Sequence, residues 1–372
     1  MIPGGAPDGP TALAALTALD IASVPSAVVQ RIREARTVMT VCHRDPEADA
    51  LGSALATALM VEHLGGRGTP VCADPVPTMY DFLPQLERFR QGPDPELEYD
   101  LIVVGDCGEL ERVGSVLTDH ADLFGRVPIV NIDHHVSNRG FGVVDWVDAE
   151  AAATCEMGTL LAGRLGVPFG AADGALAANL MAGVVIDTAN FQHPNTTART
   201  LRVASELRAA GAPLYEIAKR LYRTKPNLQL QLFGRVLARL ETSLEGRLVW
   251  STLLPDDLSA TGATAAHSEG LIDLLAQSES GEVAIVFKDL GPTSRISVRT
   301  KDGGVDATVL TGRFGGGGHA RAAGATIDRP VTEARAVVLA EAEQLIRALS
   351  DAEKVAAPSL KAERLSSAPP DA

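Results

Sequence analysis

Cysteine is scarce in this sequence, and its distribution excludes a disulfide-rich scaffold. The 4 cysteines are far apart and include no C-x-x-C pair: Cys42, Cys72, Cys107 and Cys155. We therefore expect reduced, buried thiols, as in cytosolic proteins. Long hydrophobic runs are also missing, since no apolar stretch reaches the roughly 18 residues that a membrane-spanning helix needs. The N-terminus lacks the charged region and continuous apolar stretch of a signal peptide, so we expect a soluble cytoplasmic protein without a membrane partner.

Basic residues are outnumbered by acidic ones, which restricts the partners of this protein. The chain has 33 Lys and Arg against 47 Asp and Glu, a net charge of −14 at pH 7. That charge repels polyanions at long range, so it excludes a protein that coats nucleic acid. Any phosphate ligand must be held locally, by metal ions or a few arginines. With 372 residues, of which 46% are hydrophobic, the chain is long enough for two domains with sizeable cores.

Short β-branched runs alternate with Ala- and Leu-rich segments of helical period from Arg36 to about Ala210. The predicted strands of this region are Val38–Cys42, Pro70–Ala73, Leu101–Gly105, Ile129–Asp133 and Val143–Val147. Its predicted helices include Ala50–Leu64, Glu150–Leu165 and Ala172–Thr188. Such alternation is typical of an α/β domain in which a mostly parallel sheet is covered by helices on both faces.

The pattern changes after this region, which indicates a second, smaller α/β domain. Leu214–Leu240 has a helical period, but Pro226 disfavours a continuous helix, so this segment is the predicted linker. The chain ends are rich in Pro, Ala and Ser, a composition that favours disorder. In the second domain, β-type runs mixed with helices are expected at 248–253, 283–288 and 295–299. The expected organisation is a flexible tail over 1–24, a first domain over 25–212, a helical linker over 213–240, a second domain over 241–349 and a disordered tail over 350–372.

Acidic residues and histidines occur in four stretches where a strand is expected to end or a helix to begin. These residues are His43, Asp45, Glu47 and Asp49, then Asp106, then Asp133, His134 and His135, and finally Asp187. The carboxyl ends of parallel strands lie along one edge of a sheet, so these side chains should converge on one crevice. A single Asp in such a place is often only a helix cap. Several carboxylates in one crevice repel each other, however, so together they indicate two bound metal ions, Mn²⁺, Fe²⁺ or Zn²⁺ rather than Mg²⁺.

Five motifs, in order, resemble those of the DHH phosphoesterase family. They are "HRDPEADALGS" from residue 43, the Asp that closes "LIVVGD", "DHH" at 133–135, the Asp before "TANFQHPNTT", and "GGGGHARAAG" at 315–324. The last resembles the signature of the DHHA1 domain that accompanies DHH. The resemblance runs from about Val38 to Ile327 and includes "MYDFLP" at 79–84. In length and domain content the chain is most similar to the nanoRNase and pAp-phosphatase branch, sometimes described as bifunctional oligoribonucleases.

The resemblance implies a centre of two Mn²⁺ ions in the first domain. One ion would be bound by His43, Glu47 and Asp106. The other would be bound by Asp49, Asp106, His134 and Asp187, so that Asp106 bridges the two. The implied catalytic residues are His135, which would face the substrate phosphate, and Asp133, which would orient the imidazoles. The sequence departs from the family at Glu47, where the usual residue is Asp, and the longer side chain changes the geometry at the first ion.

The second domain carries a candidate phosphate-binding surface. In "SRISVRTK", Arg295, Ser297 and Arg299 share one face of a predicted strand, although a solvated edge strand would alternate in the same way. Glycines beside His319 allow backbone amides to approach an anion closely, whereas a glycine run alone indicates only a flexible turn. The resemblance implies that Arg299 and His319 grip the substrate's phosphate or nucleotide, with Thr300 in place of the usual Ser. The substrate-binding candidates are Arg295, Arg299, Thr300, Gly316, Gly317, Gly318, His319 and Arg321.

The activity that the resemblance implies is hydrolysis of phosphate esters in short nucleotides. We expect a Mn²⁺-dependent phosphohydrolase that cleaves very short oligonucleotides and linear dinucleotides such as pApA to mononucleotides. It would also convert 3′-phosphoadenosine 5′-phosphate (pAp) to AMP. One alternative is hydrolysis of cyclic dinucleotides such as c-di-AMP. Another is a non-catalytic nucleotide sensor, in which Glu47 in place of Asp prevents metal binding at the first site. The net charge of −14 argues against a long-chain exonuclease, and the resemblance implies a homodimer.

Overall fold

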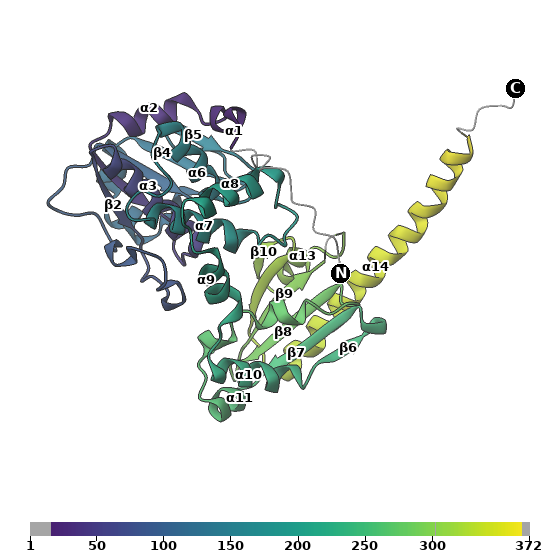
Figure 1. The fold of residues 1–372 in the computed structure, drawn as a ribbon. Coiled ribbons are helices and arrows are strands. Elements are labelled where there is room, and N and C mark those ends of the chain that lie inside the picture. The colour runs from purple at the N-terminus through teal and green to yellow at the C-terminus, as the bar shows by residue number, and fades with distance from the viewer. Residues whose placement is uncertain (1–15, 302, 367–372) are drawn as a thin grey trace, which may run out of the picture. The chain divides into compact units, whose positions relative to one another are not determined.

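Two compact units make up the chain, which divides between Thr224 and Lys225 (Figure 1). The structure, a computed structural model, describes residues 16–301 and 303–366. The division falls inside the predicted linker, whose helices belong to the units themselves. They are Leu214–Ala218 (α9) and the π-helix Lys219–Arg223 (η4) in the first unit, and Asn227–Leu237 (α10) in the second. The helix is interrupted before Pro226, as expected from the sequence.

The first unit contains a five-stranded, all-parallel sheet with the strand order β2-β1-β3-β4-β5. Its strands are Thr37–Val41 (β1), Arg67–Val71 (β2), Leu101–Gly105 (β3), Ile129–Asp133 (β4) and Val144–Val147 (β5). β3 and β4 have the predicted bounds, β1 and β5 differ from them by at most one residue at each end, and β2 begins three residues before the predicted start and ends two before the predicted end. The strand order changes direction between β1 and β3, and in such sheets a binding crevice forms at the carboxyl ends of the strands there.

Helices cover both faces of this sheet, which explains why its central strands β1, β3 and β4 are buried on both sides. Besides α9, the α-helices in the described part of this unit are Ala18–Ala22 (α1), Ser26–Glu34 (α2), Ala48–His63 (α3), Ser115–Asp119 (α4), Ala121–Arg126 (α5), Thr154–Leu165 (α6), Ala175–Asp187 (α7) and Ala198–Ala209 (α8). On one face, Val38 and Val103 pack in a core with α3, α6 and α7. On the other, Met39 and Val104 pack with α4 and α5. The predicted α/β class is confirmed.

Two boundaries of the first unit differ from the sequence prediction. The helix predicted from Ala172 begins at Ala175, because Ala172 has a left-handed backbone conformation, with φ of 52°. The predicted N-terminal tail is partly folded, since it contains α1, and Leu16 and Val24 are buried in the core. Residues 1–15 lie outside the described part of the chain.

The second unit contains a six-stranded mixed sheet with the order β10-β11-β9-β8-β7-β6. Its strands are Glu241–Ser243 (β6), Leu248–Leu253 (β7), Val283–Asp289 (β8), Ser294–Thr300 (β9), Gly317–His319 (β10) and Ala322–Ile327 (β11). Its helices besides α10 are Pro255–Thr261 (α11), Leu271–Leu275 (α12), Ala307–Gly312 (α13) and Val331–Ser366 (α14). One face of the sheet packs with α13 and α14, and the other with α10, α11 and α12. This unit is therefore also α/β, as predicted.

The last helix is longer than the sequence analysis expects. α14 continues to Ser366, into the segment for which composition favoured a disordered tail. Besides Ser and Pro, this segment contains Ala, Glu, Lys and Leu, which are strong helix formers. Across 16–301 and 303–366, none of the helices combines the length and the apolar character that crossing a bilayer requires.

Candidate functional site

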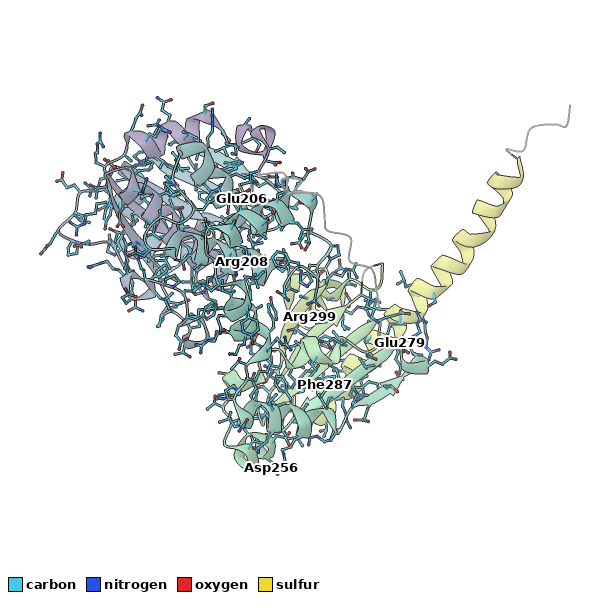
Figure 2. All side chains as sticks on the ribbon, viewed as in Figure 1. Glu206, Arg208, Asp256, Glu279, Phe287 and Arg299 are labelled. Carbon is cyan, nitrogen blue, oxygen red and sulfur yellow. The ribbon has the colours of Figure 1, made fainter. Side chains whose placement is uncertain are left out.

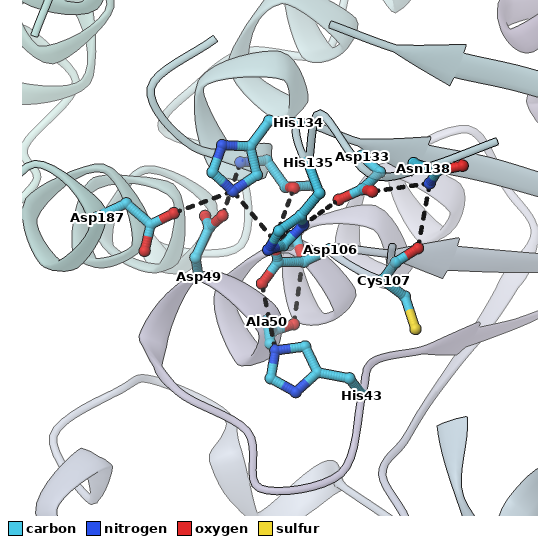
Figure 3. Close-up of polar contacts among 12 residues, drawn as sticks. His43, Asp49, Ala50, Asp106, Cys107, Asp133, His134, His135, Asn138 and Asp187 are labelled. Atoms are coloured by element: carbon cyan, nitrogen blue, oxygen red, sulfur yellow. Dashed lines mark hydrogen bonds and ion pairs between the residues drawn. The ribbon is translucent and has the colours of Figure 1, made fainter. Parts of the chain in front are cut away.

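The carboxyl edge of the parallel sheet brings most of the predicted metal ligands together (Figure 3). His43 follows the end of β1, Asp106 directly follows β3, and Asp133 is the last residue of β4. His134 and His135 come next in the chain. Asp106 has a φ of 58°, a left-handed conformation that is uncommon outside glycine and is often found at functional sites. The convergence expected from parallel strand ends is therefore present for these residues.

Asp106 lies at the centre of the cluster and is 2% exposed. Its Oδ2 lies 3.5 Å from Nε2 of His43, and its Oδ1 lies 3.5 Å from Nε2 of His134. The hydroxyl of Thr154 donates a hydrogen bond of 3.1 Å to Oδ1. The two carboxylate oxygens thus face two different imidazoles, which is the arrangement that a bridging ligand requires.

Three overlapping groups of side chains could each hold a metal ion, since the ligand atoms within each group lie within 4.8 Å of one another. The groups are His43, Glu47 and Asp106; Asp49, His134 and Asp187; and Asp106, His134 and His135. The first group is the ligand set that the resemblance implies for one ion. The second group contains three of the four ligands implied for the other ion; the fourth, Asp106, is not in this group but lies 3.5 Å from His134. Predicted catalytic residue His135 falls in the third group. Which of these residues bind metal stays a prediction.

Helices, not strands, carry Asp49 and Asp187. Asp49 is fully buried in the first turn of α3, and its carboxylate accepts hydrogen bonds from the backbone amides of Thr154 (2.6 Å) and Cys155 (2.8 Å), where α6 begins. Asp187 is the last residue of α7, and its Oδ2 lies 3.2 Å from Nε2 of His134. Asp187 was grouped with residues at strand ends or helix starts, but it lies at the end of the helix that the sequence predicts over 172–188.

Glu47 serves helix α3 as well as the cluster. It is the N-cap residue, and its carboxylate accepts hydrogen bonds from the backbone amides of Asp49 (2.6 Å) and Ala50 (2.9 Å). Its Oε1 also lies 3.9 Å from Nε2 of His43. Glu47 therefore caps the helix, a role that the sequence analysis considered only for the aspartates, and the same carboxylate still faces the cluster.

The two adjacent histidines are oriented by different acceptors. Nδ1 of His135 donates to Oδ1 of Asp133 at 2.7 Å, whereas Nδ1 of His134 donates to the backbone carbonyl of Ala151 at 3.3 Å. Asp133 is itself fixed by Asn138, whose side-chain amide donates to Oδ2 at 2.7 Å. Asp133 thus orients one imidazole and not both. In each case the bond at Nδ1 leaves Nε2 as the nitrogen available to a metal or substrate.

Burial and crowding of charge shift pKa values in the cluster. Burial and the charge of Asp106 raise the pKa of Asp49 to about 6, and burial with neighbouring carboxylates raises the pKa of Glu47 and of Asp187 well above the usual range. Burial also acts on Asp106, but hydrogen bonds from two imidazoles outweigh it and hold its pKa well below the usual range. Burial opposes protonation of His134, yet Asp106 and other carboxylates raise its pKa to about 9. Oxygen and imidazole ligands with excess negative charge fit divalent cations.

Three residues that touch this site were missed in the sequence: Asn138, Thr154 and Tyr222. Asn138 and Thr154 hold two of the aspartates described above. The hydroxyl of Tyr222 lies 3.1 Å from the last two backbone carbonyls of α7 before Asp187. The π-helix that carries Tyr222 is a rare element often found at functional sites, but the sequence gives no periodicity that distinguishes it from an α-helix.

In the second unit, β9 has the predicted alternation. Its apolar residues are buried, whereas Arg295 is exposed and Arg299 partly exposed. Strand pairing places His319 opposite Ala322, and Ala322 opposite Arg299. Residues that pair across neighbouring strands point to the same face, so Arg299 and His319 share a face about 10 Å apart at their Cα atoms. Ala322 leaves only a methyl group between them.

Two arginines of this region have contacts that the sequence did not reveal. Nε of Arg299 donates to Oδ1 of Asp273 at 2.8 Å. Nη1 of Arg321 donates to the backbone carbonyls of residues 301, 304 and 305 and to the hydroxyl of Thr300. Arg321 therefore braces the loop that follows β9, and this contact accounts for its presence without a substrate.

Comparison with known proteins adds sequence and fold relationships. Two family models match, described as "DHH family, N-terminal domain" over residues 37–184 and "DHHA1 domain" over residues 248–348. The "Bifunctional oligoribonuclease and PAP phosphatase NrnA" of Thermus thermophilus is 34% identical, with 77% of this chain and 82% of that protein covered. The protein of the same name from Bacillus subtilis is 28% identical over 78% of this chain and 89% of its own. A solved structure of an exopolyphosphatase-related protein from Bacteroides fragilis shares the fold, with a TM-score of 0.79 at 20% identity over 90% of this chain and 98% of that chain.

Proposed function

We propose that this chain, which belongs to the DHH phosphoesterase family, is a metal-dependent phosphohydrolase of very short nucleotides. Its substrates would be linear dinucleotides such as pApA, other very short oligonucleotides, and pAp. The name of the 34% identical relative supports this substrate class. The observation that carries the proposal is the pair of ligand groups on either side of Asp106, because hydrolysis of phosphate esters is typical chemistry for two closely spaced metal ions.

Two divalent ions, which we take to be Mn²⁺, fit the ligand atoms of the first unit. His43, Glu47 and Asp106 would hold one ion, and Asp49, Asp106, His134 and Asp187 the other. When bound, such ions polarise the phosphoryl oxygens and lower the pKa of a coordinated water molecule to near neutrality. The bonds at Nδ1 of His134 and at both oxygens of Asp49 hold those ligands in place before any ion arrives.

His135 would act on the substrate itself. Its Nδ1 proton is committed to Asp133, so Nε2 is the nitrogen left to face a phosphoryl oxygen and, when the ring is protonated, to donate a hydrogen bond to it. Such a bond stabilises negative charge that develops on the phosphoryl group. Asn138 fixes Asp133 from the other side, so the imidazole is held in one orientation.

The second unit would bind the part of the substrate that is not cleaved. Arg299 and His319 share a face of the sheet, and together with the glycine-rich strand β10 they form a surface suited to a phosphate.

A product time course in Mn²⁺ tests the proposal with four substrates: pAp, pApA, c-di-AMP and a long RNA. We expect AMP from pAp and pApA, with little product from the long RNA. Faster turnover of c-di-AMP than of pApA would favour the cyclic-dinucleotide alternative. Binding of pAp without any product in Mn²⁺, Co²⁺ or Mg²⁺ would indicate a nucleotide sensor. An absence of both binding and turnover for all four substrates would show the proposal to be wrong.

A further inference from the structure

The guanidinium of Arg299 already has an anion bound to it, the carboxylate of Asp273. Nε of Arg299 donates to Oδ1 of Asp273 at 2.8 Å, and Asp273 lies in the first turn of the short helix α12. The side chain of Asp273 is 54% exposed and that of Arg299 is 32% exposed. A surface ion pair of this kind adds little to the stability of a fold. The pair is therefore not needed to hold α12 in place, and an anionic ligand can compete for Arg299.

The surface beside Arg299 has room for such a ligand. Gly317 and His319 lie on β10 and face the same side of the sheet as Arg299. Apart from its chain neighbours, a Cβ added at Gly317 would meet no atom of the described residues within 4 Å, so the space directly beside it is open. Gly318 has a φ of 141°, and a Cβ there would lie 2.5 Å from the carbonyl oxygen of Ala322, so only glycine lets β10 lie this close to β11. Small residues therefore line the surface between the side chains of Arg299 and His319.

Two further basic residues lie on this side of the sheet, beyond the apolar residues Ala284 and Val286 that pack under the helices. Lys288 and Arg295 pair across β8 and β9, on the same side of the sheet as Arg299. Lys288 donates to the hydroxyl of Ser268 at 2.8 Å, and the charge of nearby Glu269 acts on it. Asp273 is the acidic residue in direct contact with Arg299. A phosphate that approaches Arg299 therefore meets the carboxylate of Asp273 directly, whereas Lys288, Arg295 and Glu269 lie farther along the sheet.

We propose that Asp273 is a specificity-determining residue, which occupies Arg299 as a resident anion and limits how tightly the terminal phosphate of a nucleotide is held there. This inference rests on the proposed function, in which Arg299 binds the uncleaved end of the substrate. A terminal phosphate carries close to two negative charges near neutral pH, so it must displace the Asp273 carboxylate or lie next to it. A nucleoside without that phosphate does not meet this repulsion. Asp273 thereby also weakens retention of a mononucleotide product.

Calorimetric titration of the full chain with AMP and with adenosine, both in Mn²⁺, tests the proposal. The variants are Asp273→Asn, Arg299→Ala, the combination of both, and Asp256→Asn. Asp256 is a matched control because it is exposed at the start of α11, away from Arg299 on β9 (Figure 2). We expect Asp273→Asn to bind AMP roughly threefold to tenfold more tightly, as removal of one nearby like charge in a solvated site predicts. Its affinity for adenosine should change much less.

The combined variant shows whether the effect acts through Arg299. In the Arg299→Ala background, Asp273→Asn should bring no further gain in AMP affinity. Weaker AMP binding by Asp273→Asn would overturn the proposal, because it would mean that Asp273 positions Arg299 for the ligand. An unchanged affinity, or an equal gain in Asp256→Asn, would overturn it as well.

Hydrolysis of pApA by the same samples separates this inference from the proposed function. If the wild-type protein cleaves pApA but Asp273→Asn does not gain AMP affinity, the proposed function is supported and the inference about Asp273 is wrong. If the protein cleaves none of the nucleotides but Asp273→Asn binds AMP more tightly, the proposed function is wrong and the inference that Asp273 competes for Arg299 is supported.

Discussion

Replacing Asp106 by Asn tests the bridging role in the metal centre. Asn keeps the shape of the side chain and can still accept the hydrogen bond from Thr154, but it removes the charge that faces both His43 and His134. Loss of a residue that only hydrogen-bonds to a metal ligand lowers metal affinity or activity about tenfold to a hundredfold. If both ions lose a direct ligand, the combined effect should be at least about 10² to 10⁴.

The assay for Asp106→Asn combines metal analysis with the rate of pApA hydrolysis. We expect the purified variant to hold fewer than two ions per chain and to lose at least about a hundredfold in kcat/KM. Asp45→Asn is the matched control, since Asp45 is exposed in the loop that carries His43 and belongs to none of the three ligand groups. Two tightly held ions in Asp106→Asn, or an equal loss in Asp45→Asn, would refute the assignment of Asp106 as the bridge.

Three further predictions concern the other ligands, the second unit and pH. Glu47→Asp should remain active or improve, because Asp is the usual family residue and also caps helices well; a folded variant without activity would show that the site is built around the longer side chain. The Arg299→Ala and His319→Ala variants should keep their metal ions yet lose roughly tenfold to a hundredfold in kcat/KM for pAp and pApA. Their loss in kcat/KM for bis-p-nitrophenyl phosphate should be much smaller. Loss of the metal ions, or equal losses on both kinds of substrate, would contradict this prediction. Metal affinity should rise with pH from about 5 to 9, because Asp49 (pKa about 6) and His134 (pKa about 9) must both lose protons to bind a cation. Calorimetry in buffers of different ionisation enthalpy should detect the release of these protons. A metal affinity that does not change with pH would contradict the prediction.

The parts of the site that follow from strand ends could be predicted from the sequence. The apolar runs before Asp106 and Asp133 have the length and the β-branched content of buried strands, and both strands have the expected bounds. Parallel strands bring their carboxyl ends to one edge, so proximity of these residues followed without knowledge of the strand order. The alternation in β9 likewise fixed which side of the strand Arg299 faces, because strand residues alternate with period two.

Other features depend on tertiary packing that local pattern does not contain. Asp187 ends a helix whose residues are apolar on all sides, so the sequence does not indicate which neighbours it will meet. The capping role of Glu47 and the Asn138 bond to Asp133 require the exact backbone positions of a helix start and a loop. The pairing of Arg299 with Asp273 joins residues far apart in the chain, and many exposed acids would have been equally plausible partners.

The backbone around the cluster explains how four carboxylates can gather at one edge before a metal binds. The start of α3 supplies two amide donors to Glu47, and the start of α6 supplies two to Asp49, so helix N-termini compensate part of both charges. The imidazoles compensate Asp106, whose pKa is held low. Asp187 lies instead at the C-terminus of α7, where the helix dipole is unfavourable to an anion, and burial and the other carboxylates raise its pKa. The carboxylate of Asp187 is compensated by Nε2 of His134, 3.2 Å from its Oδ2, and a cation bound in this group would add to that compensation.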